Sequence, residues 1–98
     1  MILNTIQDAL KVRGAKSLLK RLCKNSCKYV GASGARHSSD MLCDGYYLEI
    51  SRDSSYKDEF YLSLIKWGEE DEDYVIVDEL RFHCRNAAHA YVKIKEFA

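Results

Sequence analysis

Apolar residues at helical spacing mark the N-terminal third of the chain. They fall on one side of a helix: Ile2, Leu3, Ile6, Leu10, Ala15, Leu18, Leu19, Leu22 and Cys23. Such a repeat is typical of an amphipathic helix that packs on a core. Asn4 or Thr5 can cap its first turn. Gly14 interrupts the pattern, which leaves two alternatives, one kinked helix or two short helices.

Alternating apolar and polar residues predict three β-strands in the middle of the chain. They cover residues 46–51, 60–67 and 74–82, and this period of two is what a half-buried strand shows. The polar segments 53–58 and 68–73 are short enough to be hairpin connections between neighbouring strands.

The stretch before the first of these strands has no apolar period. Residues 31–40 are small and polar, which predicts a flexible loop. Cys43, Asp44 and Gly45 then mark a turn that leads into the first strand.

Strand alternation divides the apolar residues between two faces of a sheet. We expect one set in the core: Leu48, Ile50, Phe60, Leu62, Leu64, Ile76 and Leu80. Tyr74 and Phe82 share that face, and Asp78 is its polar exception. The opposite face would then carry Tyr47, Tyr61, Ile65, Trp67, Val75 and Val77. We expect this second face to be aromatic and partly open, the alternative being that the 31–40 loop or part of the N-terminal helix covers it.

The chain returns to helical spacing in its last segment, 86–98. Asn86 is a suitable N-cap, and Ala87, Tyr91 and Ile94 share one side. The order α-β-β-β-α predicts a single α+β domain over residues 1–98. Strands joined by hairpins pair in sequence, so we expect a three-stranded antiparallel sheet with helices packed on one face.

A net charge of zero conceals a strong charge polarity. Residues 1–36 carry eight Lys/Arg against Asp8 alone, whereas residues 37–80 carry thirteen Asp/Glu against three Lys/Arg. The N-terminal helix presents a lysine ladder, defined as Lys16, Lys20, Lys24 and Lys28, with Arg13 and Arg21 beside it. The ladder has three interpretations: a solvated face, a contact with the acidic turn of the same or a second copy, or a phosphate-binding surface.

The aromatic face and the acidic turn are the candidate partner-binding residues. We expect Tyr47, Tyr61 and Trp67 to anchor a protein partner or a second copy of the chain, because aromatic residues dominate binding hot spots. The acidic residues are Glu69, Glu70, Asp71, Glu72 and Asp73. They can steer the approach of a basic partner, such as a nucleic-acid-handling protein, and the alternative is a solvated turn.

The four cysteines, Cys23, Cys27, Cys43 and Cys84, do not have the spacing of a zinc site. Zinc would need them together with His37, His83 or His89, but the usual Cys-x2-Cys pair is missing. Reduced thiols in the core are favoured, since no export signal precedes them. The acidic turn also lacks the ligand spacing of a calcium loop.

No motif for catalysis or membrane insertion is present. The chain has no glycine-rich phosphate loop, nucleophile elbow or paired-carboxylate motif. No apolar run approaches the roughly 20 residues that span a bilayer, and charged residues follow the N-terminus too soon for a secretory signal. We therefore expect a cytoplasmic protein without enzymatic activity, cofactor or bound metal.

The order of elements resembles that of the double-stranded RNA-binding domain. Residues 85–90, Arg-Asn-Ala-Ala-His-Ala, resemble the start of that family's last helix. The resemblance implies nucleic-acid binding, and here the basic N-terminal helix would supply the contacts through Arg13 and the lysine ladder. The chain departs from the family in two places. Only Arg85 stands where the family has several lysines, and residues 53–58 lack its Gly-Pro-x-His pattern.

Size and surface favour a binding protein of another kind. Small inhibitors of host defence systems carried by phages and other mobile elements, anti-CRISPR proteins among them, occupy this size range. We therefore expect an inhibitor or adaptor that binds a protein, with nucleic-acid binding as the alternative.

Overall fold

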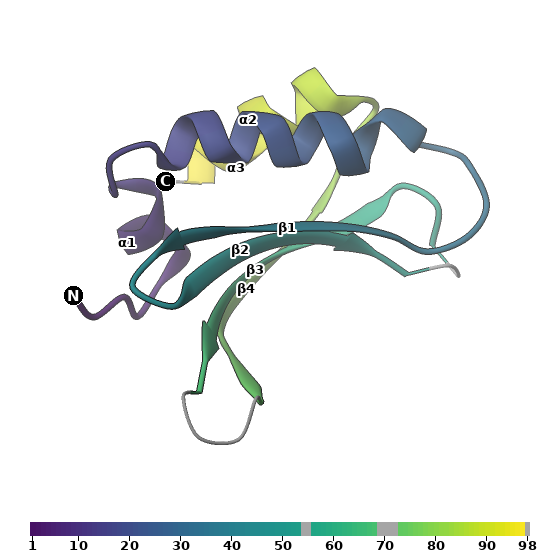
Figure 1. Ribbon diagram of the computed structural model, residues 1–98. Helices are drawn as coiled ribbons and strands as arrows, with labels where there is room; N and C mark the ends of the chain where they lie inside the picture. The colour runs from purple at the N-terminus through teal and green to yellow at the C-terminus, as the bar shows by residue number, and fades with distance from the viewer. Residues whose placement is uncertain (54–55, 69–72, 98) are drawn as a thin grey trace.

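In the computed structural model the chain forms a layer of helices over one antiparallel sheet (Figure 1). The structure describes residues 1–53, 56–68 and 73–97. The helices are α1 (Ile6–Leu10), α2 (Ala15–Ser26), a 3₁₀ turn η1 (Cys27–Tyr29) and α3 (Ala87–Phe97). The strands are β1 (Arg36–Cys43), β2 (Tyr46–Arg52), β3 (Glu59–Trp67) and β4 (Tyr74–His83), which pair in the order β1-β2-β3-β4.

The α+β class and the antiparallel sheet are as predicted, but the expected number of strands was wrong. Residues 36–43, most of which were expected to lie in a flexible loop, form the edge strand β1 and pair with β2. Residues 36–40 are polar on both faces and apolar side chains begin only at Met41, so apolar alternation gives no signal over most of the strand. Backbone hydrogen bonds to β2 hold it instead, and polar residues are usual on an edge strand. Asp40 also pairs with Arg21 of α2 at 2.8 Å.

The β1–β2 connection confirms the predicted turn. Asp44 and Gly45 both have positive φ, 45° and 80°. A two-residue hairpin turn of this kind needs φ above zero at both positions, which Asp and Gly tolerate best.

The N-terminal segment contains two helices and not one. The Thr5 hydroxyl caps α1 by accepting a hydrogen bond from the Asp8 N–H at 3.1 Å. Gly14 lies directly before α2 with a φ of 86°, in the left-handed region that glycine favours. Gly14 therefore changes the direction of the chain between the helices, and the alternative of one kinked helix is wrong.

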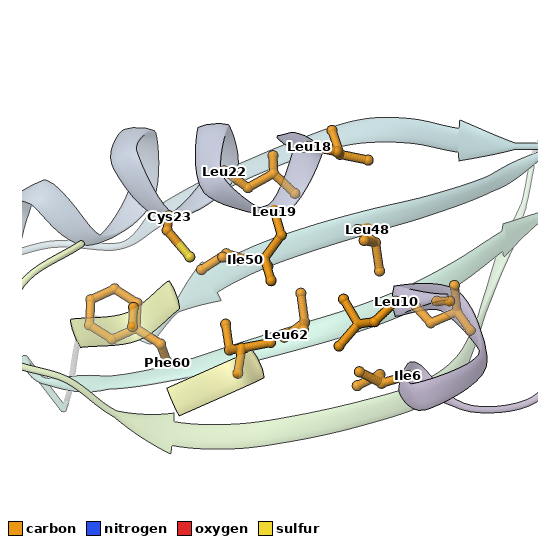
Figure 2. Packing of buried hydrophobic residues seen from close by; sticks show 14 of the residues in the cluster. Ile6, Leu10, Leu18, Leu19, Leu22, Cys23, Leu48, Ile50, Phe60 and Leu62 are labelled. Carbon is orange, nitrogen blue, oxygen red and sulfur yellow. The ribbon is translucent and has the colours of Figure 1, made fainter. Parts of the chain in front are cut away.

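The core lies between the helices and the sheet (Figure 2). The fully buried side chains include Leu19 and Leu22 of α2, Leu48 and Ile50 of β2, and Phe60 of β3. Burial of a large aliphatic or aromatic side chain contributes about 1.5–3 kcal/mol each. Ile2, which the helical pattern placed with this set, is 79% exposed.

A β-bulge in β4 reverses the predicted faces of its first half. Leu64 pairs with Asp78 and Ile65 pairs with Ile76, so Val77 has no partner in β3. One extra residue shifts every side chain before it to the other face. Ile76 was expected in the core and is 51% exposed, while Val77 was expected on the open face and packs against the core.

A carboxylate lies on the helix side of the sheet directly after the bulge, where Asp78 alternates in register with Leu80 and Phe82. Asp78 Oδ2 accepts a hydrogen bond from the backbone N–H of Ile6 at 2.8 Å. This N–H belongs to the first turn of α1 and has no partner inside the helix. Asp78 thus connects α1 to β4.

Candidate functional site

One face of the sheet carries no helix. All the helices lie on the opposite side, and the β3–β4 hairpin extends away from them (Figure 1). Within the described residues nothing covers this open face, so neither the 31–40 segment nor the N-terminal helix fills it. Strand pairing places its side chains in rows, and one row is Met41, Tyr47, Ile65 and Ile76.

An aromatic cluster occupies one end of the open face. We define it as Tyr47, Ile65, Trp67 and Tyr74. The ring centroids of Tyr47 and Trp67 are 6.2 Å apart at an interplanar angle of 73°, and those of Trp67 and Tyr74 are 5.4 Å apart at 55°. Ile65 is only 6% exposed, whereas Trp67 and Tyr74 are 40% and 55% exposed. The rings thus shield an apolar floor and remain accessible themselves.

A shallow hollow opens inside this cluster. It has a volume of about 230 Å³, and Ser39 and Glu49 line it together with the four cluster residues. Glu49 is half-buried and lies between Ser39 and Ser63 on the neighbouring strands. No Lys or Arg lines the hollow, so its electrostatic character is negative.

Tyr61, the third predicted anchor, lies at the other end of the open face. It lies six positions before Trp67 in β3, which is about 20 Å along a strand. Its hydroxyl donates a hydrogen bond to Glu59 at 3.0 Å, and Arg81 contacts the same carboxylate at 3.4 Å. The hydrogen bond to Glu59 raises the pKa of the Tyr61 phenol above its ordinary value. The structure therefore brings Tyr47 and Trp67 together but leaves Tyr61 in a separate polar group.

Most of the predicted acidic turn lies outside the described residues. This applies to Glu69, Glu70, Asp71 and Glu72. Asp73 is exposed at the start of the β4 side of the hairpin, and its carbonyl accepts a hydrogen bond from the Gly68 N–H at 2.8 Å. Trp67 and Tyr74 are the last pair of the β3–β4 ladder, so the adjoining Gly68 and Asp73 lie at the cluster end of the sheet.

The helix layer is strongly basic. Residues 6–29 and 87–97 carry nine Lys/Arg against Asp8 and Glu96, a net charge of about +7. Arg13 and all four lysines of the ladder are exposed. Among the described residues, no lysine of the ladder forms an ion pair, and only Arg21 of this surface does, with Asp40.

A groove of about 620 Å³ runs between α2 and α3 on this basic side. Lys20, Lys24 and Lys95 line it, with Tyr91 among its apolar residues. The ammonium groups of Lys20 and Lys95 lie 5.6 Å and 4.5 Å from the Tyr91 ring centroid. These cation–π contacts occupy the aromatic surface of the groove from within the chain.

Three of the four cysteines lie in the core. Cys23, Cys27 and Cys84 are buried, and Cys43 is half-buried near Met1. Hydrogen bonding with Cys23, together with burial, raises the pKa of the Cys27 thiol to about 12. Hydrogen bonding with Cys27 and burial raise the pKa of the Cys84 thiol as well. Protonated thiols are weak nucleophiles. In the part of the chain that the structure describes, no group of three or more His, Cys, Asp and Glu is arranged to hold a metal ion.

Sequence patterns missed three members of the open-face site, Ser39, Glu49 and Tyr74. Ser39 falls in the segment that was expected to be a flexible loop. Tyr74 was expected on the core face, because an unbroken strand over residues 74–82 would place all of its even-numbered residues on that side. Glu49 was not singled out, because a charged residue in an exposed strand position is ordinary. The polar Asp78 gives no warning of the bulge, because it lies on the helix side of β4 with or without an extra residue before it.

No helix in residues 1–53, 56–68 and 73–97 is long and apolar enough to cross a membrane. The open face of the sheet and the helix layer are two contrasting surfaces. The first is aromatic and carries carboxylates, and the second is basic. Comparison with known protein families, curated proteins and solved structures finds no match for this chain.

Proposed function

We propose that this protein is a non-enzymatic binding protein, an inhibitor or adaptor of the cytoplasm, that docks a protein partner on the open face of its sheet. The partner contacts Tyr47 and Trp67, with Tyr74 as a third anchor. Phage or mobile-element inhibitors of host defence systems, anti-CRISPR proteins included, are the functional class that a chain of this size and surface suits best.

The single observation that supports this proposal most is the accessible aromatic cluster. Exposed apolar surface is costly in water, and a contiguous patch of it on a small domain is typical of an interaction site. Met41 and Ile76, 57% and 51% exposed, extend the cluster across the sheet. Tyr and Trp at the centre of such a patch are the residues that carry most binding energy in protein interfaces.

The basic helix layer supports a second candidate function, nucleic-acid binding. Lys16, Lys20 and Lys24 lie one turn apart on α2, and phosphates are recognised by basic groups along one face. Against it, Lys20 is engaged with Tyr91, and the sheet has four strands, not the three on which the likeness to the double-stranded RNA-binding domain rests.

The proposal is tested by capture followed by reconstitution. The immobilised chain recovers partners from an extract of the cells in which it is made, and each recovered protein is purified and titrated by calorimetry. We expect Trp67→Ala to weaken the complex by about thirtyfold or more, as for a central interface aromatic. Tyr61→Ala is the matched aromatic control at the far end of the same face, and its loss should be clearly smaller.

The helix layer is tested with the same proteins. The triple variant Lys16→Glu, Lys20→Glu, Lys24→Glu should keep its protein partner. In a gel-shift assay, duplex RNA or DNA should not bind tightly. The nucleic-acid function is correct if duplex binding is tight and is lost in the triple variant. The logarithm of its affinity should then fall with the logarithm of the salt concentration, with a slope of about 0.9 per phosphate neutralised on B-DNA.

A folded Trp67→Ala protein with full partner affinity and unchanged self-association would refute the open-face proposal.

A further inference from the structure

We infer that the aromatic cluster and Glu49 form a recognition site for an arginine side chain of the protein partner. This inference rests on the proposed function, because it names the chemical group that the partner inserts into the open face. It assigns the hollow of about 230 Å³ to the guanidinium group of that arginine.

The first argument is the arrangement of the rings. The 73° and 55° angles mean that Tyr47, Trp67 and Tyr74 do not stack flat on one another. All three rings line the hollow in different orientations, so it offers several aromatic groups to a cation, and aromatic groups of this kind recognise organic cations. A guanidinium is planar and weakly hydrated, so it stacks on such faces more readily than an ammonium does.

The second argument is the charge of the lining. Glu49 is the one charged residue among the residues that border the hollow. It forms no ion pair among the described residues. A carboxylate beside aromatic rings offers a guanidinium two parallel charge-assisted hydrogen bonds, a geometry that lysine cannot match.

The third argument comes from the other aromatic rings of the chain. Lys66 lies 4.4 Å from the Tyr46 ring centroid, Lys95 lies 4.5 Å from that of Tyr91, and Arg36 lies 4.9 Å from that of Tyr29. These rings already hold a cation of the same molecule. In the described part of the chain no basic group lies over Tyr47, Trp67 or Tyr74, which leaves the rings of the cluster open to a cation from outside.

The surroundings of the hollow fit a basic partner. Glu79 lies on the same face, where it accepts a hydrogen bond from Ser63 at 3.2 Å. Asp73 is exposed and directly precedes Tyr74, the first residue of β4. Negative charge around an anchoring pocket raises the association rate of a positively charged protein surface.

The experiment uses Trp67 as its own reporter. It is the only tryptophan of the chain, so its indole N–H gives a single resonance in a nitrogen–proton correlation spectrum. The ¹⁵N-labelled protein is titrated with Nα-acetyl-arginine amide, with the lysine analogue, and with the citrulline analogue, an uncharged isostere of arginine. We expect a saturable shift with arginine in the millimolar range, and an affinity about tenfold lower for citrulline.

Two conservative variants locate the charge that matters. Glu49→Gln should lower the affinity for the arginine probe about fivefold or more and remove the preference over citrulline. Glu79→Gln is the matched control, since it removes one carboxylate from the same face outside the hollow, and it should leave the affinity within twofold. Tyr74→Leu keeps the Trp67 reporter and should weaken binding through loss of one ring.

The inference is overturned if citrulline binds as well as arginine, if lysine binds more tightly than arginine, or if Glu49→Gln and Glu79→Gln behave alike. Its failure is distinguishable from that of the proposed function. A complex that is lost in Trp67→Ala, together with no response to arginine, removes the arginine site but keeps the docking face. A response to arginine beside a complex that Trp67→Ala leaves intact keeps the site and removes the proposed docking face.

Discussion

At the scale of single residues, Asp78 shows how one polar side chain can organise the packing of a helix on a sheet. It lies on the helix side of β4, where its neighbours Leu80 and Phe82 point into the core. Its carboxylate accepts a hydrogen bond from the Ile6 N–H at 2.8 Å. A carboxylate at the first turn of a helix also interacts favourably with the partial positive charge there. Ile6, which this contact positions, is fully buried.

We predict that Asp78→Ala lowers the free energy of unfolding by about 1 kcal/mol, the usual cost of losing a side-chain cap. The half-buried Ile6 N–H would then lack its partner. Urea denaturation of the wild type and the variant measures the difference. Glu79→Gln is the control one position along the strand, because its side chain lies on the open face and glutamine keeps an acceptor for the Ser63 hydroxyl, and it should change stability by less than about 0.5 kcal/mol. Equal changes in the two variants would contradict this role.

At the scale of elements, the sequence pattern predicted the strands in which apolar and polar residues alternate, and it missed β1, which is mostly polar. Strands β2 and β3 were predictable because Leu48, Ile50, Leu62 and Leu64 alternate with polar residues. β1 was not predictable, since backbone pairing with β2 stabilises it, and such pairing is not visible in the pattern of apolar residues. For the same reason the bulge at Val77 was missed, and with it the membership of Tyr74 in the candidate site.

The α1–α2 junction gives the prediction at this scale. Gly14 has a φ of 86°, and a Cβ atom at this position would meet nothing within 4 Å. The cost of Gly14→Ala is therefore conformational and not steric. We predict a loss of about 1–2 kcal/mol in unfolding free energy, measured by urea denaturation. Gly14→Asn should lose less, because asparagine tolerates the left-handed region better. An alanine variant as stable as the wild type would contradict the assigned backbone conformation.

At the scale of the whole molecule, the charge polarity of the sequence is a polarity between two layers. The helix layer is basic, whereas the open face of the sheet carries the carboxylates of Glu49 and Glu79. The molecule extends 37 × 28 × 17 Å along its principal axes. Apart from the Arg21–Asp40 pair, charges on the outer surfaces of the two layers are therefore separated by more than the roughly 10 Å over which 0.1 M salt screens them. Neighbouring lysines of the ladder, about 5–6 Å apart at their Cβ atoms, still repel one another.

We predict that salt stabilises this protein in the range from about 0.1 M to about 0.5 M NaCl, because it screens the remaining repulsion within the ladder. Three repulsive pairs of a few tenths of a kcal/mol each correspond to a rise of about 2 °C or more in the melting temperature. Differential scanning calorimetry measures it. Lys24→Gln removes two of the three pairs and should lose most of the salt effect. A melting temperature that falls with salt in the wild type would show that attraction between the layers dominates instead.

Val77 has a consequence for how such a protein evolves. It is the residue of β4 without a partner in β3, and it decides that Tyr74 and Ile76 face outward, while Asp78, which follows it, keeps the side that Leu80 and Phe82 share. The gain or loss of one codon at this place therefore changes which residues of the first half of β4 form the binding surface. Point substitutions at Tyr74 or Ile76 only adjust the surface. We therefore expect an insertion or deletion next to Val77 to change this binding surface more than any single substitution in the strand does.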